Sequence, residues 1–378
     1  MTSAGSEMSL GARGRASSAY NRVASGFSSR WSRLPLAAKG TIVIALYLAL
    51  AVVVPMHFVG RIMAPQSGWT AALSEQIGIF VLLAIGLNVV VGQAGMLDLG
   101  YVGFWAVGGY TFAILATKHH WDFWLILPVG IVTAAISGLV LGAPTLRLRG
   151  DYLAIVTLGF GLIISQAITN LSFDGGAQGI SSIPHPPSIK GVKQLTYGVL
   201  DYKPYWYLVL AMIFLAVFAV RRLERSRVGR AWVAIREDED VAELMGVPTY
   251  RFRLWAFAIG AAVGGVGGVL YASQANAIQP TTFSYQVSIL VVAAVVLGGS
   301  GNLLGVIFGG FLVAWLPERF RNFESYRFLV FGAALVVVMI IRPEGLIPSR
   351  RHRAEIAEGA AGGGMAAPLM PPDVEGAS

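Results

Sequence analysis

The stretch GLNVVVGQAGMLDLGYVGFWAVGGY, residues 86–110, sets a glycine-rich break between two hydrophobic runs. Asn88 precedes the break, Gly92, Gly95 and Gly100 lie in it, and it carries one acid, Asp98. Backbone that leaves a helix at membrane depth must be covered by protein or by a water-filled cavity, because its polar groups find no partner in lipid. The stretch therefore predicts a broken transmembrane helix.

A second stretch, VVAAVVLGGSGNLLGVIFGGF at residues 291–311, has the same pattern. If one residue is gapped, the glycines at 92, 95 and 100 align with those at 298, 301 and 305. Paired breaks in two halves of a membrane protein indicate a translocation pathway between repeats. The candidate pathway or gate residues are Asn88, Gly92, Gly95, Asp98, Gly100, Gly298, Gly299 and Gly301.

The composition excludes a soluble globular protein. Of 378 residues, 55% are hydrophobic and 13% are charged, which is about half the charged fraction of a soluble domain. The apolar residues come in blocks, so the sequence predicts an all-α integral membrane protein, a polytopic helix bundle. The chain has no cysteine, which excludes disulfides and thiolate metal sites. A net charge of +8 fits basic cytoplasmic loops better than nucleic-acid binding.

A helix needs about 20 apolar residues to cross a membrane. The sequence offers ten candidate spans, two of them short, at residues 41–59, 74–91, 101–117, 123–142, 152–171, 205–220, 254–271, 287–297, 303–316 and 328–341. With both termini inside, 20 of the 28 lysines and arginines fall in cytoplasmic segments, which satisfies the positive-inside rule. We therefore expect about ten spans.

The remaining segments flank or connect the membrane domain, predicted at residues 41–342. Residues 1–40 are expected to be a disordered cytoplasmic tail, and residues 343–378 a second one that is largely disordered. Residues 172–204 form an external loop, which is either a small docking or gating element or an ordinary solvated connection.

Close helix packing is the alternative explanation for both breaks, because small residues let transmembrane backbones approach. For AIGAAVGGVGGVLYA, residues 258–272, packing is the favoured explanation.

Asp98 also has two interpretations. A deep carboxylate would be functional by default, but the predicted topology puts Asp98 near the cytoplasmic end of a hairpin. There it would cap a helix or pair with an arginine of RLRGD, residues 147–151.

The sequence lacks motifs for covalent chemistry and nucleotide binding. It has no Gly-x-x-x-x-Gly-Lys-Ser/Thr loop, no His-Glu-x-x-His and no Gly-x-Ser-x-Gly. We therefore expect no enzyme, no metal site and no cofactor in this chain. Few acids lie near the membrane interior, which disfavours coupling to protons or sodium ions. Energy for uphill transport would have to come from another chain.

The most polar run between two apolar spans is RVGRAWVAIREDEDVAELMGVPTYRFR, residues 227–253, in the predicted cytoplasmic loop 221–253. Asp238 or Glu239 can cap a short helix there, which Gly246 and a following proline would end. Its apolar face suits a groove on a cytoplasmic partner; a solvated loop is the alternative. The candidate docking residues are Glu237, Asp238, Glu239, Asp240, Val241, Ala242, Glu243, Leu244, Met245 and Gly246.

Several of these segments together carry a resemblance to a known family. They are GLNVVVGQAGMLDLGYVGFWAVGGY, APTLRLRGDYLAIVTLGFG, GRAWVAIREDEDVAELMGVPTYRFRLWAFAIGAAVGGVGGVLYA and VVLGGSGNLLGVIFGG, with RPEGLI closing the last span. On these segments, which cover most of residues 86–347, the chain resembles the permease subunits of branched-chain amino acid ABC importers, in the high-affinity permease M subfamily.

The resemblance implies an alternating-access pathway between this chain and a second, homologous permease subunit in a bacterial inner membrane. Two cytoplasmic ATPase subunits would bind the ATP, and a periplasmic or extracellular solute-binding protein would deliver the amino acid. A coupling helix, often Glu-Ala-Ala-x-x-x-Gly, docks on the ATPase in such importers. The matching positions here are Asp240, Val241, Ala242 and Gly246, and the first two depart from the pattern.

Other functions stay open on the sequence. The hydrophobic interior and the resemblance favour an amino acid with an aliphatic side chain, but urea, short amides or other amino acids are alternative substrates. An ion-coupled secondary carrier and a membrane enzyme or structural subunit are rival classes.

Overall fold

The computed structural model describes residues 54–55, 68–146, 148, 150–170, 176–187, 197–198 and 202–319, and then 329, 332–333, 336–337, 340 and 345–347. The chain divides into two compact units, Met1–Val59 and Gly60–Ser378, and all the helices and strands named here belong to the second. The predicted tail 1–40 lies outside the described residues. So do most of the predicted spans 41–59 and 328–341 and nearly all of the predicted tail 343–378.

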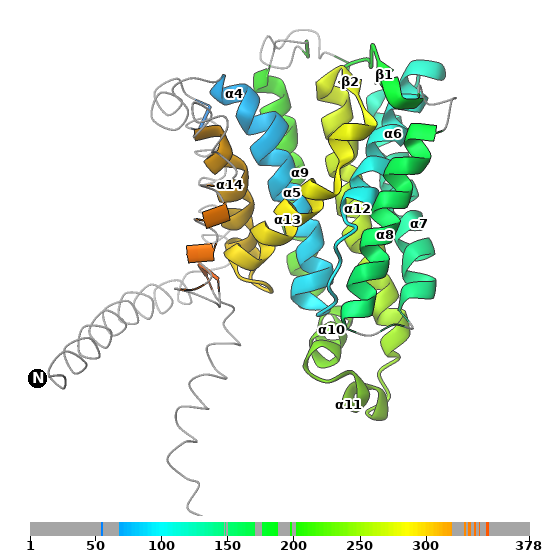
Figure 1. The fold of residues 1–378 in the computed structure, drawn as a ribbon, viewed down its shortest axis with the longest axis vertical. Coiled ribbons are helices and arrows are strands. Elements are labelled where there is room, and N and C mark those ends of the chain that lie inside the picture. Colours follow the sequence, from blue (N-terminus) through cyan, green and yellow to red (C-terminus); the bar gives the residue numbers. More distant parts are fainter. Residues whose placement is uncertain are drawn as a thin grey trace, which may run out of the picture. The chain divides into compact units, whose positions relative to one another are not determined.

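The described part of the second unit is a bundle of helices (Figure 1). Its first member is one continuous rod, Trp69–Gln93, in which α4 (Trp69–Ala71) and α5 (Gly78–Asn88) are each followed by a π-helical segment, η1 (Ala72–Ile77) and η2 (Val89–Gln93). The other bundle helices are α6 (Val102–Lys118), α7 (Phe123–Thr145), α8 (Asp151–Asn170), α9 (Tyr202–Glu224), α12 (Thr249–Ala275), α13 (Tyr285–Gly298) and α14 (Leu303–Arg319).

Five of these segments are long and apolar enough to cross a membrane: Trp69–Gln93, Phe123–Thr145, Tyr152–Asn170, Tyr202–Glu224 and Thr249–Ala275. A helix lies at each predicted span between residues 74 and 316, and most of these helices extend beyond the predicted bounds. Hydropathy marks only the apolar middle of a span, whereas polar residues such as Arg221 and Arg222 continue the helix of α9 because their heads reach water. The prediction of a helical membrane protein is confirmed in this coarse form.

Helix α12 is the centre of the bundle, packed against α5, α6 and α7. Its glycines permit this packing, because other backbones occupy the space that a Cβ atom would need. A Cβ on Gly268 would lie 2.2 Å from the carbonyl oxygen of Trp105 and 2.5 Å from the amide nitrogen of Gly109. The packing interpretation of residues 258–272 is therefore confirmed.

Replacing Gly268 with alanine is expected to destabilise the bundle by about 1–3 kcal/mol, the usual cost of overpacking a filled core. Gly159 on α8 is the matched control, because nothing lies within 4 Å of a Cβ built there. Gly159→Ala should leave stability unchanged or raise it slightly, since alanine favours helix. Thermal unfolding of the purified variants in detergent measures the difference, and equal midpoints for the two variants would contradict it.

Within the described residues, one short strand pair is the exception to the all-α prediction. In it, β1 (Ile180–Ser181) pairs antiparallel with β2 (Ala277–Ile278). Along the chain, the short helix η4 (Gly176–Gln178) comes just before β1, and η6 (Pro280–Phe283) comes just after β2. The described part of the predicted external loop is also tied to the bundle by His185, whose Nδ1 lies 2.7 Å from the hydroxyl of Tyr205. That hydroxyl donates to the carbonyl of Ser273 at 2.9 Å.

The segment 221–253 is not the loop with one short helix that the sequence predicted. Helix α9 runs on to Glu224, α10 (Arg227–Glu237) and α11 (Glu239–Leu244) follow, and α12 begins at Thr249. Helix α10 forms because Ser226 caps it, accepting from the amides of Val228 and Gly229, and because it has an apolar face to bury. Its fully buried Trp232 donates from Nε1 to the carbonyl of Phe252 at 2.7 Å. Helices α10 and α11 lie at the end of the bundle opposite β1 and β2 (Figure 1).

Candidate functional site

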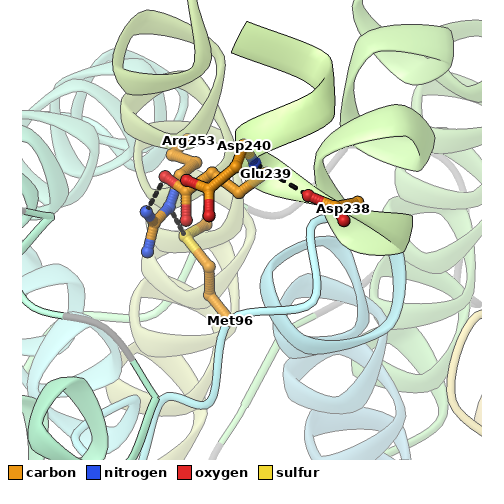
Figure 2. Close-up of polar contacts among 5 residues, drawn as sticks. All are labelled: Met96, Asp238, Glu239, Asp240 and Arg253. Carbon is orange, nitrogen blue, oxygen red and sulfur yellow. Dashed lines mark hydrogen bonds and ion pairs between the residues drawn. The ribbon is translucent and has the colours of Figure 1, made fainter. Parts of the chain in front are cut away.

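Helix α11 begins and ends on the residues that the sequence indicated. The Asp238 carboxylate accepts from the amides of Asp240, at 2.9 Å, and Val241, at 3.0 Å, so Asp238 is the cap. After the helix, Gly246 adopts φ +83°, the left-handed conformation that glycine favours at a helix end. Glu239, the alternative cap, instead pairs with Arg253 through an Oε1–Nη1 distance of 2.5 Å (Figure 2).

The two faces of α11 differ. Ala242 is buried, with 4% of its surface exposed, whereas Val241 is 53%, Leu244 87% and Met245 80% exposed. Three large apolar side chains therefore project outward from a short helix rich in acids. The other candidate docking residues Glu237, Asp238, Asp240, Glu243 and Gly246 are exposed as well.

Arg253 joins α11 to the first helix break. Only 5% of this residue is exposed, and its guanidinium binds Glu239 with Nη1 while Nε donates to the Sδ of Met96 at 3.2 Å (Figure 2). A buried charge is tolerated when it is paired and hydrogen-bonded. The pair therefore fixes the start of α11 against α12 and against the chain that follows η2.

Arg236, near the end of α10, contacts the same break at a second place. Its Nη1 donates to the carbonyl of Gly92, and its aliphatic part lies against Gly95, where an added Cβ would come 2.8 Å from the Cγ of Arg236. Gly95 has φ +72° and lies just beyond the end of the rod at Gln93. Two arginines from the two helices that flank α11 thus hold the first break.

The two predicted breaks are in contact with each other. The first spans residues 94–101 between η2 and α6, and the second spans 299–302 between α13 and α14. The amide of Gly301 donates to the Oδ1 of Asn88 at 2.9 Å, and a Cβ on Gly92 would lie 2.5 Å from that amide nitrogen. Gly95 and Gly301, which the sequence alignment paired, both have positive φ, +72° and +83°.

The other candidate pathway residues lie close by but make different contacts. Asp98 is fully buried, and its Oδ1 accepts from the amide of Gly100 at 2.9 Å. It shapes the turn before α6 and does not cap that helix, since the N-cap residue is Tyr101. The arginines of RLRGD lie outside the described residues, so their pairing with Asp98 stays a prediction. Gly298, at the end of α13, packs on Gly305 of α14.

A cavity of about 210 Å³ lies where these elements meet. Its lining includes Gly95, Met96, Gly150, Arg236, Glu239 and Arg253. The side chains that link α10, α11 and α12 to the first break therefore border open space on one side.

Arg236 and Arg253 were not among the residues predicted from the sequence, although helical spacing gave a signal for each. Arg236 lies four residues after Trp232, and Arg253 lies four residues before Phe257, and both aromatic residues are fully buried. Residues four apart share a helix face, so this spacing puts each arginine on the side of its helix that packs against the bundle. Their partners in the break could not be found this way, because they are 144 and 157 residues distant in sequence.

An apolar bundle with five segments able to cross a membrane, two broken helices that touch and a polar helical end defines a multi-pass membrane protein of the transporter kind. A family model described as the permease component of the branched-chain amino acid transport system matches residues 70–339. The chain belongs to this family, so the resemblance identified from the sequence is confirmed.

Individual relatives agree with the family. The chain is 41% identical over 306 residues to the high-affinity branched-chain amino acid transport system permease protein LivM of Escherichia coli K12, covering 76% of this chain and 72% of the relative. It is 27% identical to a probable LivM of Methanocaldococcus jannaschii, an alignment that covers 72% of this chain and 91% of the relative. The E. coli K12 permease protein LivH is 26% identical, and that alignment covers 71% of this chain and 91% of the relative. No solved structure matches the chain.

Proposed function

We propose that the chain is the membrane permease subunit of an ABC importer that carries branched-chain, aliphatic amino acids. The observation that carries this proposal is the family match over residues 70–339, which spans both helix breaks and the α10–α11 segment. The 41% identity to a permease of a branched-chain amino acid transport system supports the substrate class.

The importer contains a second, homologous permease subunit. Two relatives from one organism, named LivM and LivH, belong to high-affinity branched-chain amino acid transport systems, and this chain is similar to both. Helices α8 and α9 support an assembly of this kind. In the apolar stretch of each helix, only 28% of the residues are buried within the chain. Their remaining surface faces lipid or a partner subunit.

The membrane is the bacterial inner membrane, and the chain crosses it about ten times with both termini in the cytoplasm. Arginines are concentrated around α10 and α11, and by the positive-inside rule this supports a cytoplasmic position for this end of the bundle. The β1–β2 end then faces outward, toward a solute-binding protein.

Two ATPase subunits dock on the α10–α11 end and supply the energy. The sequence has no phosphate-binding loop of its own, and α11 offers an exposed apolar surface made by Val241, Leu244 and Met245. We name these three residues the docking face. Ala242, which the sequence included among the docking residues, is not part of it because it is buried.

The solute passes near the two breaks. Backbone groups at helix ends can hold the charged groups of an amino acid, and the breaks bring such groups together at Gly92, Gly95 and Gly301. Movement of the α10–α11 end then changes how these breaks pack and so opens the pathway to one side or the other.

Reconstitution in liposomes tests the proposal. The permease pair with its ATPases and binding protein should accumulate labelled leucine only when ATP is supplied, and isoleucine and valine should compete while urea and acetamide should not. Accumulation by the permease alone under an ion gradient would identify a secondary carrier. Competition by urea would place the substrate in another class.

A further inference from the structure

Arg236 is a side chain of α10 that contacts the first helix break and borders the second. We propose that Arg236 is a positioning residue that transmits movement of the α10–α11 segment to the breaks. The inference rests on the proposed function, since it assigns a role within the transport cycle of an ATP-driven importer.

The contacts of Arg236 reach both breaks. Its Nη1 donates to the carbonyl of Gly92, and its stem lies on Gly95. A Cβ built on Gly301 would come 2.7 Å from the same Nη1, so the guanidinium borders the second break as well. Because Gly301 also binds Asn88, one arginine closes a small junction in which the two breaks and α10 meet.

The Gly92 carbonyl is a place where one hydrogen bond can bias a conformation. The last four carbonyls of a helix have no partner within that helix, and Gly92 is in the final turn of the rod Trp69–Gln93. A cation at this end also interacts favourably with the helix dipole. With Arg236 in place, the Gly92 carbonyl accepts a hydrogen bond. When Arg236 is withdrawn, this carbonyl needs a new partner, and other packings of the break become more favourable.

Helix α10 can carry motion to this point because it is fixed to its neighbours. Trp232 anchors it to α12 at the carbonyl of Phe252, and α11 is fixed to α12 by the pair of Glu239 and Arg253. A push on α11 therefore moves the α10–α12 pair together, and with it Arg236.

Arg236 and Arg253 differ in how free they are to move. Arg253 is buried and holds an ion pair, which makes it a fixed structural element. Arg236 is exposed as a whole residue and borders the cavity of about 210 Å³, so its side chain can leave the Gly92 carbonyl without opening the core. Removing it should therefore alter the coupling of transport to hydrolysis more than it alters stability.

The test uses Arg236→Gln in the complete importer, with uptake and ATP hydrolysis measured on the same liposomes. The ATPases should co-purify as with the unaltered chain, and hydrolysis should continue. The amino acid transported per ATP should fall roughly tenfold, as expected when a charge-assisted hydrogen bond that biases two states is lost. Arg236→Lys keeps a charged donor and should restore most of the ratio.

Arg230→Gln is the matched control, because Arg230 is exposed on the same helix and, among the described residues, its hydrogen bond stays within its own segment, to the carbonyl of Arg225 at 3.3 Å. It removes the same charge and should leave transport per ATP unchanged. A ratio for Arg236→Gln equal to that of the unaltered chain would overturn the proposal. So would equal losses in the Gln and Lys variants that match a loss of thermal stability.

A second measurement needs no ATPase. Amide hydrogen exchange in residues 89–96 of the purified permease should be faster in Arg236→Gln than in Arg230→Gln, because the junction opens more often. Equal exchange in both would overturn the role of Arg236. If the unaltered importer fails to transport in spite of this difference, the proposed function fails instead, so the two failures are distinguishable.

Discussion

Replacing Leu244 and Met245 together with glutamate is expected to release the ATPase subunits from the permease. Both side chains are almost fully exposed, at 87% and 80%, so the change should alter folding stability by no more than about 0.5 kcal/mol. Apolar anchors at the centre of an interface are worth about 2 kcal/mol or more each. Loss of both, with two charges left unpaired in the interface, should weaken docking by at least about 100-fold.

The measurement is co-purification of the ATPases with tagged permease, followed by titration of the purified ATPase to give a dissociation constant. The matched control is the exchange Leu244→Met with Met245→Leu, which keeps the apolar surface and should keep binding. An unchanged dissociation constant in the glutamate variant would show that α11 is not part of the docking site. Loss of binding in the control as well would mean that the shape of the segment matters and its apolar character does not.

Replacing Arg253 with methionine is expected to give the second large effect. Arg253 is 5% exposed, and its removal takes the guanidinium away from the partly buried Glu239 carboxylate. Removing one partner of a fully buried ion pair costs about 3–5 kcal/mol. Glu239 keeps a side-chain exposure of 24%, so a loss of about 2–3 kcal/mol in the free energy of unfolding is the expected result here. Denaturant unfolding in mixed micelles measures it.

The double variant Arg253→Met with Glu239→Gln decides whether the ion pair is the cause. It removes both charges, so neither charge is left buried away from its partner, which is the costly outcome when one member of a buried pair is removed. We expect it to recover most of the lost stability. Equal destabilisation in the single and double variants would attribute the loss to packing around Met96. The single variant should also bind the ATPases more weakly, because α11 loses its anchor on α12.

The membrane class, the positions of the apolar spanning helices and the two breaks could be predicted because each depends on local sequence. Blocks of apolar residues determine a spanning helix regardless of the rest of the chain. The cap at Asp238 and the end at Gly246 follow from the chemistry of single residues. Helix α10 was not predicted in the segment 221–253, although its Ser226 cap is local, because the burial of Trp232 against α12 is a tertiary contact that the local sequence does not identify.

By itself, the sequence determined an apolar helical chain, its family, the location of its breaks and a polar segment able to contact a partner. The tertiary structure decided which of these parts meet. Gly92 and Gly301 lie side by side, Arg236 and Arg253 reach the first break, and Ala242 faces inward while Leu244 faces outward. Helical periodicity states which face a side chain occupies, but the partner on that face is chosen by the packing of segments distant in sequence.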